Sequence, residues 1–103
     1  IEDMMYKLEQ TDIRIEAKKT DYAFIILKSI EIRQDTIGYI APRMTEILSQ
    51  YISQGKPDYA QSVVDTIFAG IDNEQMVSSL VTYIQNNIVN KEYLKKIDMT
   101  VGR

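Results

Sequence analysis

The sequence predicts an all-α fold, a small bundle of four to five helices in which a longer N-terminal helix can form a coiled-coil-like seam. Three observations lead to this prediction. Apolar residues recur at helical spacing in the second half of the chain, prolines and glycines stand where helices would begin and end, and apolar residues near the N-terminus recur at every seventh position. The 103 residues have ordinary hydrophobic (45%) and charged (26%) shares. They fit a single helical domain over residues 1–103, which can itself be a fragment of a longer chain.

Four residues of the N-terminal part lie seven positions apart, namely Ile1, Leu8, Ile15 and Tyr22. This spacing is typical of the apolar seam of a helix, and further apolar residues fill its intermediate positions: Met4, Met5, Ile25, Ile26 and Ile32. Thr11 and Lys18 occupy intermediate positions at which the seam requires apolar residues. From Ile1 to about Ile40 the sequence therefore predicts helix, either as one seam that is weak in its middle or as two helices.

Two helices that meet near Lys19 to Asp21 are the preferred interpretation. Thr20 and Asp21 offer an N-cap immediately before the apolar run from Tyr22 to Leu27, because a hydroxyl or carboxylate at that position can accept a hydrogen bond from a free backbone N–H. The sequence thus predicts a helix break near residue 20.

A strand pair within residues 12–33 is the rival interpretation. Apolar and polar residues alternate from Asp12 to Glu16 and again from Ser29 to Arg33, which is the period of a half-buried strand. Between these segments there is no glycine, no proline and no turn dipeptide, so a hairpin has no natural point of reversal. Helix remains the prediction, with the strand pair left open.

Two amphipathic helices are predicted between residues 42 and 70. The first has Pro42 in its first turn and ends at Gly55, and the second begins at Pro57 and ends at Gly70. The short turn between them makes the two helices antiparallel neighbours. Their apolar stripes consist of Met44, Ile47, Leu48, Tyr51 and Ile52 in the first helix, and of Ala60, Val63, Val64, Ile67 and Phe68 in the second.

A third helix is expected to begin after Asp72 or Asn73 and to end near Asn90, and a last short helix is expected through Tyr93, Leu94 and Ile97. The apolar stripe of the third helix is Met76, Val77, Leu80, Val81, Ile84 and Ile88. Between Gln75 and Asn90 this helix carries no charged residue, although a solvated helix normally exposes Lys and Glu. Either the helix is central and packed on several sides, or its polar face meets a partner.

The composition removes several classes of function. The chain has no cysteine and no histidine, so thiol nucleophiles, disulfides, zinc clusters and histidine general bases are absent. No catalytic, metal-binding or cofactor-binding residue is predicted, and we expect no enzymatic activity. A net charge of −3 and a pI near 4.9 argue against nucleic acid as a partner. No stretch is long and apolar enough to span a membrane, and the lack of cysteine agrees with a cytoplasmic location.

We therefore expect a non-enzymatic helical protein–protein interaction and self-association domain, a homo-oligomer with a regulatory or adaptor role. The residues expected to carry self-association are Ile1, Met5, Leu8 and Ile15, and those of a second, partner-binding surface are Ser78, Thr82 and Gln85.

Two alternatives stay open. One is a DNA-binding regulator domain with a helix-turn-helix-like unit around residues 42–70, in which Arg43 and Lys56 reach phosphate. Its recognition helix would carry Asp58 and Asp65 and no Lys or Arg, which disfavours contact with a phosphate backbone. The other alternative is a helical small-ligand-binding or immunity-type protein.

Overall fold

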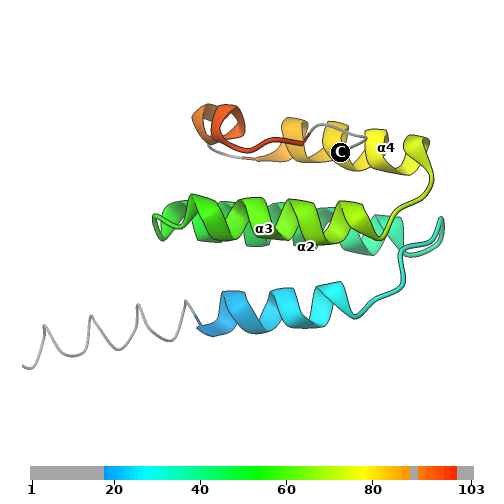
Figure 1. Cartoon of the computed structure of the whole chain (residues 1–103), viewed down its shortest axis with the longest axis horizontal. Helices are drawn as coiled ribbons and strands as arrows, with labels where there is room; N and C mark the ends of the chain where they lie inside the picture. The colour runs from blue at the N-terminus through cyan, green and yellow to red at the C-terminus, as the bar shows by residue number, and fades with distance from the viewer. Residues whose placement is uncertain (1–17, 89–90, 100–103) are drawn as a thin grey trace, which may run out of the picture.

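The computed structural model describes residues 18–88 and 91–99, and the regular structure in these ranges is entirely helical. Residues 18–28 are helical, and they are followed by α2 (Ile37–Ser53), α3 (Pro57–Ala69), α4 (Glu74–Asn87) and the 3-10 helix η1 (Lys91–Lys96). Figure 1 shows residues 18–28 on one side of α2 and α3, and α4 with η1 on the opposite side. The predicted small all-α bundle is confirmed.

The central helix of the bundle is α2. Its apolar residues recur at helical spacing, and the side chains of Ile40, Met44 and Leu48 are fully buried. It packs against both α3 and α4. The helix begins at Ile37, earlier than predicted, so Pro42 lies inside it and not in its first turn. Because Pro42 has no backbone N–H, the carbonyl of Gly38, four residues earlier, receives no helical hydrogen bond. Gly38 is exposed, so water can donate to this carbonyl instead.

The turn between α2 and α3 has the predicted form. Gly55 adopts a φ of +73°, a left-handed conformation that glycine accepts without steric cost. Pro57 then occupies the first turn of α3, where its missing N–H costs no helical hydrogen bond. On α3 the buried residues are Ala60, Val63, Val64 and Ile67, all members of the predicted stripe.

An asparagine cap begins α4, as predicted. The Asn73 side chain accepts a hydrogen bond from the backbone N–H of Gln75 at 2.8 Å. The helix buries Val77, Leu80 and Ile84 and ends at Asn87, while residues 89–90 lie outside the described ranges. The predicted last short helix is present as η1.

The predicted helix break near residue 20 is wrong. Residues 18–28 are continuously helical, and the chain leaves the helix over residues 29–36 instead. Of the rival strand pair, Ser29 to Arg33 form no strand, and Asp12 to Glu16 lie outside the described residues.

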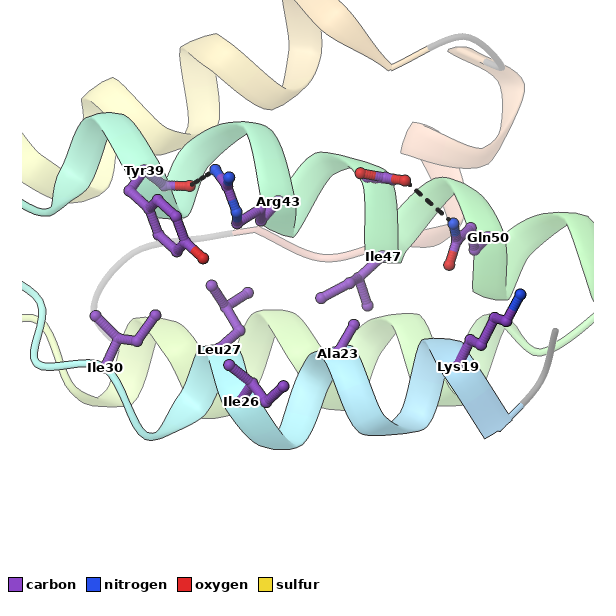
Figure 2. A pocket seen from close by; sticks show the side chains of 10 residues that line it. Lys19, Ala23, Ile26, Leu27, Ile30, Tyr39, Arg43, Ile47 and Gln50 are labelled. Carbon is purple, nitrogen blue, oxygen red and sulfur yellow. Dashed lines mark hydrogen bonds between the residues drawn. The ribbon is translucent and has the colours of Figure 1, made fainter. Parts of the chain in front are cut away.

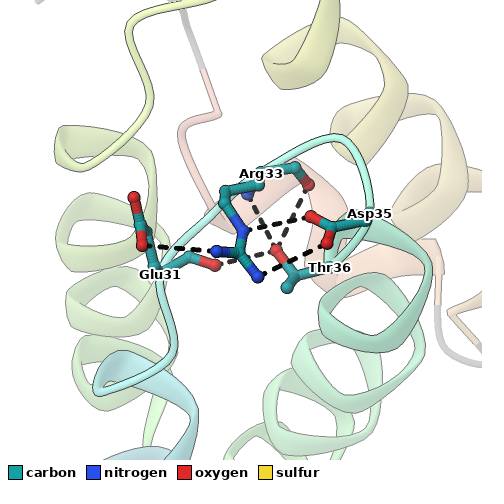
Figure 3. A network of polar contacts seen from close by, with 4 residues as sticks. All are labelled: Glu31, Arg33, Asp35 and Thr36. Atoms are coloured by element: carbon teal, nitrogen blue, oxygen red, sulfur yellow. Dashed lines mark hydrogen bonds and ion pairs between the residues drawn. The ribbon is translucent and has the colours of Figure 1, made fainter.

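Polar contacts organise the loop over residues 29–36, which contains neither glycine nor proline (Figure 3). The hydroxyl of Thr36 accepts a hydrogen bond from the backbone N–H of Arg33 at 2.8 Å and donates to the carbonyl of Glu31 at 2.7 Å. The Arg33 guanidinium in turn donates to Asp35 at 3.0 Å. These side-chain contacts stabilise the turn in place of the glycine or proline from which the end of a helix is usually predicted in a sequence.

Thr20, the predicted N-cap, instead fastens the helical residues 18–28 to α2. It is 1% exposed, and its hydroxyl donates to Oε1 of Gln50 at 2.8 Å and accepts from Nε2 of Gln54 at 3.0 Å. About two helical turns after Thr20, on the same side of the helix, the buried Leu27 belongs to the same apolar core as Ile47 and Leu48. Residues 18–28 are thus held to α2 by polar contacts near one end and by apolar packing near the other.

We expect Thr20→Val to lower the free energy of unfolding by about 1–3 kcal/mol, because it keeps the shape of the buried side chain but removes its hydrogen bonds to the half-buried amides of Gln50 and Gln54. Urea denaturation measures this effect. The matched control is Thr82→Val on the exposed side of α4, which should change stability by less than about 0.5 kcal/mol. Equal effects of both substitutions would contradict the role assigned to Thr20.

Candidate functional site

Large exposed apolar side chains gather on one side of the protein. Among the side chains that the structure describes (residues 18–88, 91, 92, 94, 95 and 97–99), five are large, apolar and exposed, and they share one location, the outward side of residues 18–28 and the two helices beside it. We call them the outer face: Tyr22 (66% exposed), Ile25 (53%), Ile26 (45%), Tyr39 (46%) and Tyr59 (51%). Scattered exposed apolar residues need no explanation, but a contiguous group of this kind is typical of a binding surface.

Residues 18–28 carry apolar side chains on two opposite sides of the same helix. The inner side, with Thr20 and Leu27, is buried against α2. Tyr22, Ile25 and Ile26 follow at spacings of three and four residues on the side that points away. The sequence pattern predicted that these three residues occupy positions in an apolar seam, and the structure shows that their side chains do not pack in the core of the domain.

A groove separates residues 18–28 from α2 on one flank of the outer face. This α2 groove has a volume of about 370 Å³, and aliphatic side chains from both helices, such as Leu27 and Ile47, form its floor (Figure 2). Its rim is polar and charged. The Arg43 guanidinium stacks 3.4 Å from the centre of the Tyr39 ring and donates to the Tyr39 carbonyl at 3.1 Å. Lys19, Glu46 and Gln50 complete the rim.

The opposite flank of the outer face is a second groove, between residues 18–28 and α3. This α3 groove has a volume of about 440 Å³, and its lining is mostly apolar: Asp21, Phe24, Ile25, Tyr51, Asp58, Tyr59 and Ser62. The buried Tyr51 hydroxyl donates to the Asp21 carboxylate at 2.5 Å, and the Tyr51 ring meets that of Tyr59 edge to face, with the ring centres 5.4 Å apart. Side chains of α2 therefore line both grooves: Ile47 in the α2 groove and Tyr51 in the α3 groove.

Tyr51 also has a perturbed acidity. Burial raises the pKa of its hydroxyl well above the usual 10.0, and the hydrogen bond to Asp21 and the charges of Asp21 and Tyr59 raise it further. The neutral hydroxyl is thus the form that the fold requires, and it connects residues 18–28 to α2.

The predicted partner surface lies on the far side of the molecule. Ser78, Thr82 and Gln85 are all exposed on α4, which packs on α2 with one side only. The interpretation of α4 as a central helix packed on several sides is therefore wrong. Its uncharged polar side is open to solvent, and a shallow hollow of about 450 Å³ there is lined by Ser78, Ser79, Thr82, Tyr83, Asn86 and Asn87. We call this surface the α4 face.

The self-association residues predicted from the sequence, Ile1, Met5, Leu8 and Ile15, lie outside the described residues. Tyr22, the next residue in their seven-residue pattern, is described, and it is the most exposed of the large apolar side chains that the structure describes. Sequence reasoning missed Tyr39 and Tyr59. Helical spacing separates Tyr59 from the buried Tyr51, which belongs to the predicted apolar stripe, but it does not show that Tyr39 and Tyr59 lie beside residues 18–28, because that depends on how these residues lie across α2 and α3.

The helix pair proposed for DNA binding runs side by side in the middle of the molecule (Figure 1). The Lys56 ammonium lies 5.0 Å from the centre of the Tyr59 ring. Arg43, the other cation of that hypothesis, is stacked on Tyr39, and α3 carries Asp58 and Asp65 without a basic residue. The positions of these charged residues therefore give no additional support to the DNA-binding hypothesis.

Comparison of the chain with protein-family models, with curated proteins and with solved structures gives no match. In the described part of the chain, no group of acidic side chains is arranged to hold a metal ion, and no helix is long and apolar enough to cross a membrane. The outer face and the α4 face are therefore the candidate binding surfaces of the described residues.

We expect Tyr51→Phe to lower the free energy of unfolding by about 1–3 kcal/mol at pH 7, because it removes a buried hydrogen bond to a carboxylate. The pKa of Tyr51 is higher in the folded than in the unfolded state, so its contribution is complete below about pH 10 and falls as the pH rises above that value. The stability of the Phe variant should therefore decline less steeply in alkali. Urea titrations between pH 7 and 11 measure both effects.

The matched control for this substitution is Tyr59→Phe, which leaves the bond between Tyr51 and Asp21 in place. It should change stability at pH 7 by less than about 0.5 kcal/mol. A Tyr51→Phe variant as stable as the unmodified protein would show that this hydrogen bond does not hold residues 18–28 on α2.

Proposed function

We propose that the protein is a non-enzymatic helical protein–protein interaction and self-association domain that associates through its outer face. One observation carries this proposal. All five large exposed apolar side chains among those that the structure describes (residues 18–88, 91, 92, 94, 95 and 97–99) lie on that face, and α4 itself exposes none.

The energetics support association. Complete burial of an Ile side chain stabilises by about 1.5–3 kcal/mol, so burying the exposed half of Ile25 and of Ile26 contributes about 1 kcal/mol for each. Tyr22, Tyr39 and Tyr59 add aromatic surface of the kind that is enriched at the centre of interfaces, with hydroxyl groups that can bond at its edge.

The geometry of residues 18–28 also supports the proposal. A helix that is apolar on two opposite sides needs two packing partners, and the fold supplies one of them, α2, to the inner side. The outer side continues the seven-residue pattern of Ile1, Leu8 and Ile15, the residues proposed for self-association.

The α4 face has the chemistry for a different kind of partner. Ser78, Thr82 and Gln85 can each donate and accept hydrogen bonds, and no fixed charge in this stretch has to be desolvated when a partner covers them. The outer face and the α4 face lie on opposite sides of α2 and α3, so one copy has room for both contacts (Figure 1). A regulatory or adaptor role in the cytoplasm, with a second protein on α4, belongs to this proposal.

We expect the double variant Ile25→Glu/Ile26→Glu to shift the protein to monomer at concentrations where the unmodified chain is oligomeric, because two charges would have to be buried in the interface. Light scattering on a sizing column at two concentrations measures the mass. The fold should persist, since both side chains are exposed and the core does not contain them.

The matched control places the same two charges on the other side, as Thr82→Glu/Gln85→Glu. This variant should keep the mass of the unmodified chain, because α4 is not part of the outer face. A chain that is monomeric at every concentration, or an outer-face variant that stays oligomeric, would refute self-association through this face.

A further inference from the structure

We propose that the α2 groove binds a small amphipathic carboxylate, with an aliphatic body on the groove floor and the carboxylate group beside the guanidinium of Arg43. The proposal goes beyond the proposed function, because one copy of the chain contains the whole site and no second copy is needed. Every residue that lines the groove lies between positions 19 and 50, within the described part of the chain.

The floor of the α2 groove is aliphatic. Ala23 and Leu27 contribute to it from residues 18–28, and Ile47 contributes from α2 (Figure 2). The groove volume of about 370 Å³ falls within the range of roughly 300–1,000 Å³ that is typical of small-molecule sites. The floor can therefore cover a short aliphatic chain, and removal of that chain from water favours binding.

Arg43 places a positive charge at one end of the rim. Its guanidinium stacks 3.4 Å from the centre of the Tyr39 ring, and one of its N–H groups donates to the Tyr39 carbonyl at 3.1 Å. These contacts orient the guanidinium and leave further N–H donors for an anion. In the described part of the chain, no carboxylate forms an ion pair with Arg43. A carboxylate is the group that a guanidinium binds through two parallel hydrogen bonds.

The charge of the rim fits a ligand with a single negative charge. Two cations, Lys19 and Arg43, and one carboxylate, that of Glu46, line the groove. Glu46 accepts a hydrogen bond from the Gln50 amide at 3.3 Å, which turns it toward the end of the groove away from Arg43. The rim thus attracts one carboxylate, while Glu46 disfavours a second negative charge such as that of a phosphate ester.

The α3 groove has the opposite charge. The two charged side chains that line it, Asp21 and Asp58, are both acidic. The two grooves lie on either flank of the same helix, so an anionic ligand should distinguish them. Neighbouring isoleucines report on the difference, because Ile25 lines the α3 groove and Ile26 lines the α2 groove.

Octanoate is the probe, and spectra of isoleucine δ1 methyl groups report where it binds. On titration of the unmodified chain, we expect saturable shifts of the Ile26 and Ile47 signals and no comparable shift of Ile25 or of the buried Ile84 in α4. The lower of the two protein concentrations used for light scattering keeps competition from self-association smallest, since Ile26 also belongs to the outer face. No saturable shift, or an equal shift of Ile25, would overturn the proposal.

Arg43→Met tests the charge. It should weaken octanoate binding about fivefold, because an ion pair with hydrogen bonds is lost, and it should not weaken binding of octylamine, which has the same chain and a positive charge at pH 7. The matched control is Lys28→Met, which removes an exposed cation beside the Phe24 ring, on the flank that borders α3, and should change octanoate affinity less than about twofold. Equal losses for octanoate and octylamine, or an unchanged octanoate affinity in Arg43→Met, would contradict the role of Arg43.

Ala23→Leu tests the floor. The larger side chain occupies part of the α2 groove, so octanoate binding should weaken at least about fivefold. The matched control is Ser62→Leu, which enlarges an exposed side chain that lines the α3 groove and should leave octanoate binding unchanged. The signals of core isoleucines in the same spectra verify that both variants are folded. Octanoate binding that persists in Ala23→Leu would place the ligand outside the α2 groove and overturn the proposal.

Discussion

The packing of residues 18–28 on α2 is the constraint on which the rest of this structure depends. Thr20 and Leu27 bind the inner side of this helix to α2, and Tyr51 adds a hydrogen bond to Asp21 at its edge. A helix has one side that faces its neighbours, so once Leu27 is buried, Tyr22 has to point away from the core. The same contact forms both grooves, because each lies between residues 18–28 and a helix of the central layer.

The polar part of this contact gives it a definite geometry. Apolar packing alone tolerates rotation of a short helix about its axis, whereas the buried hydroxyls of Thr20 and Tyr51 have to meet specific acceptors to avoid a desolvation cost. Those two hydrogen bonds hold the rotation at which Ile25 and Ile26 are exposed. The stability of the fold and the composition of the outer face are therefore coupled through the same few side chains.

The two sides of the molecule differ in chemistry. The outer face combines aromatic and aliphatic residues with lysines and arginine at its edges, while the α4 face consists of hydroxyl and amide side chains without charge. The first chemistry favours association by apolar burial, and the second favours a contact made of hydrogen bonds. The two faces are separated by α2 and α3, and the proposed adaptor role rests on this separation (Figure 1).

The sequence by itself determined the elements with strong local signals. Pro57, Gly55 and Asn73 each fix a helix end through their own backbone or side-chain chemistry, and the stripes of α2, α3 and α4 follow from helical spacing. It could not place the break at residues 29–36, where Thr36 and Arg33 act through contacts that depend on the folded loop. Only the tertiary structure decided which of the two apolar sides of residues 18–28 is buried, because both have helical spacing and the choice depends on the surface that α2 and α3 present to them.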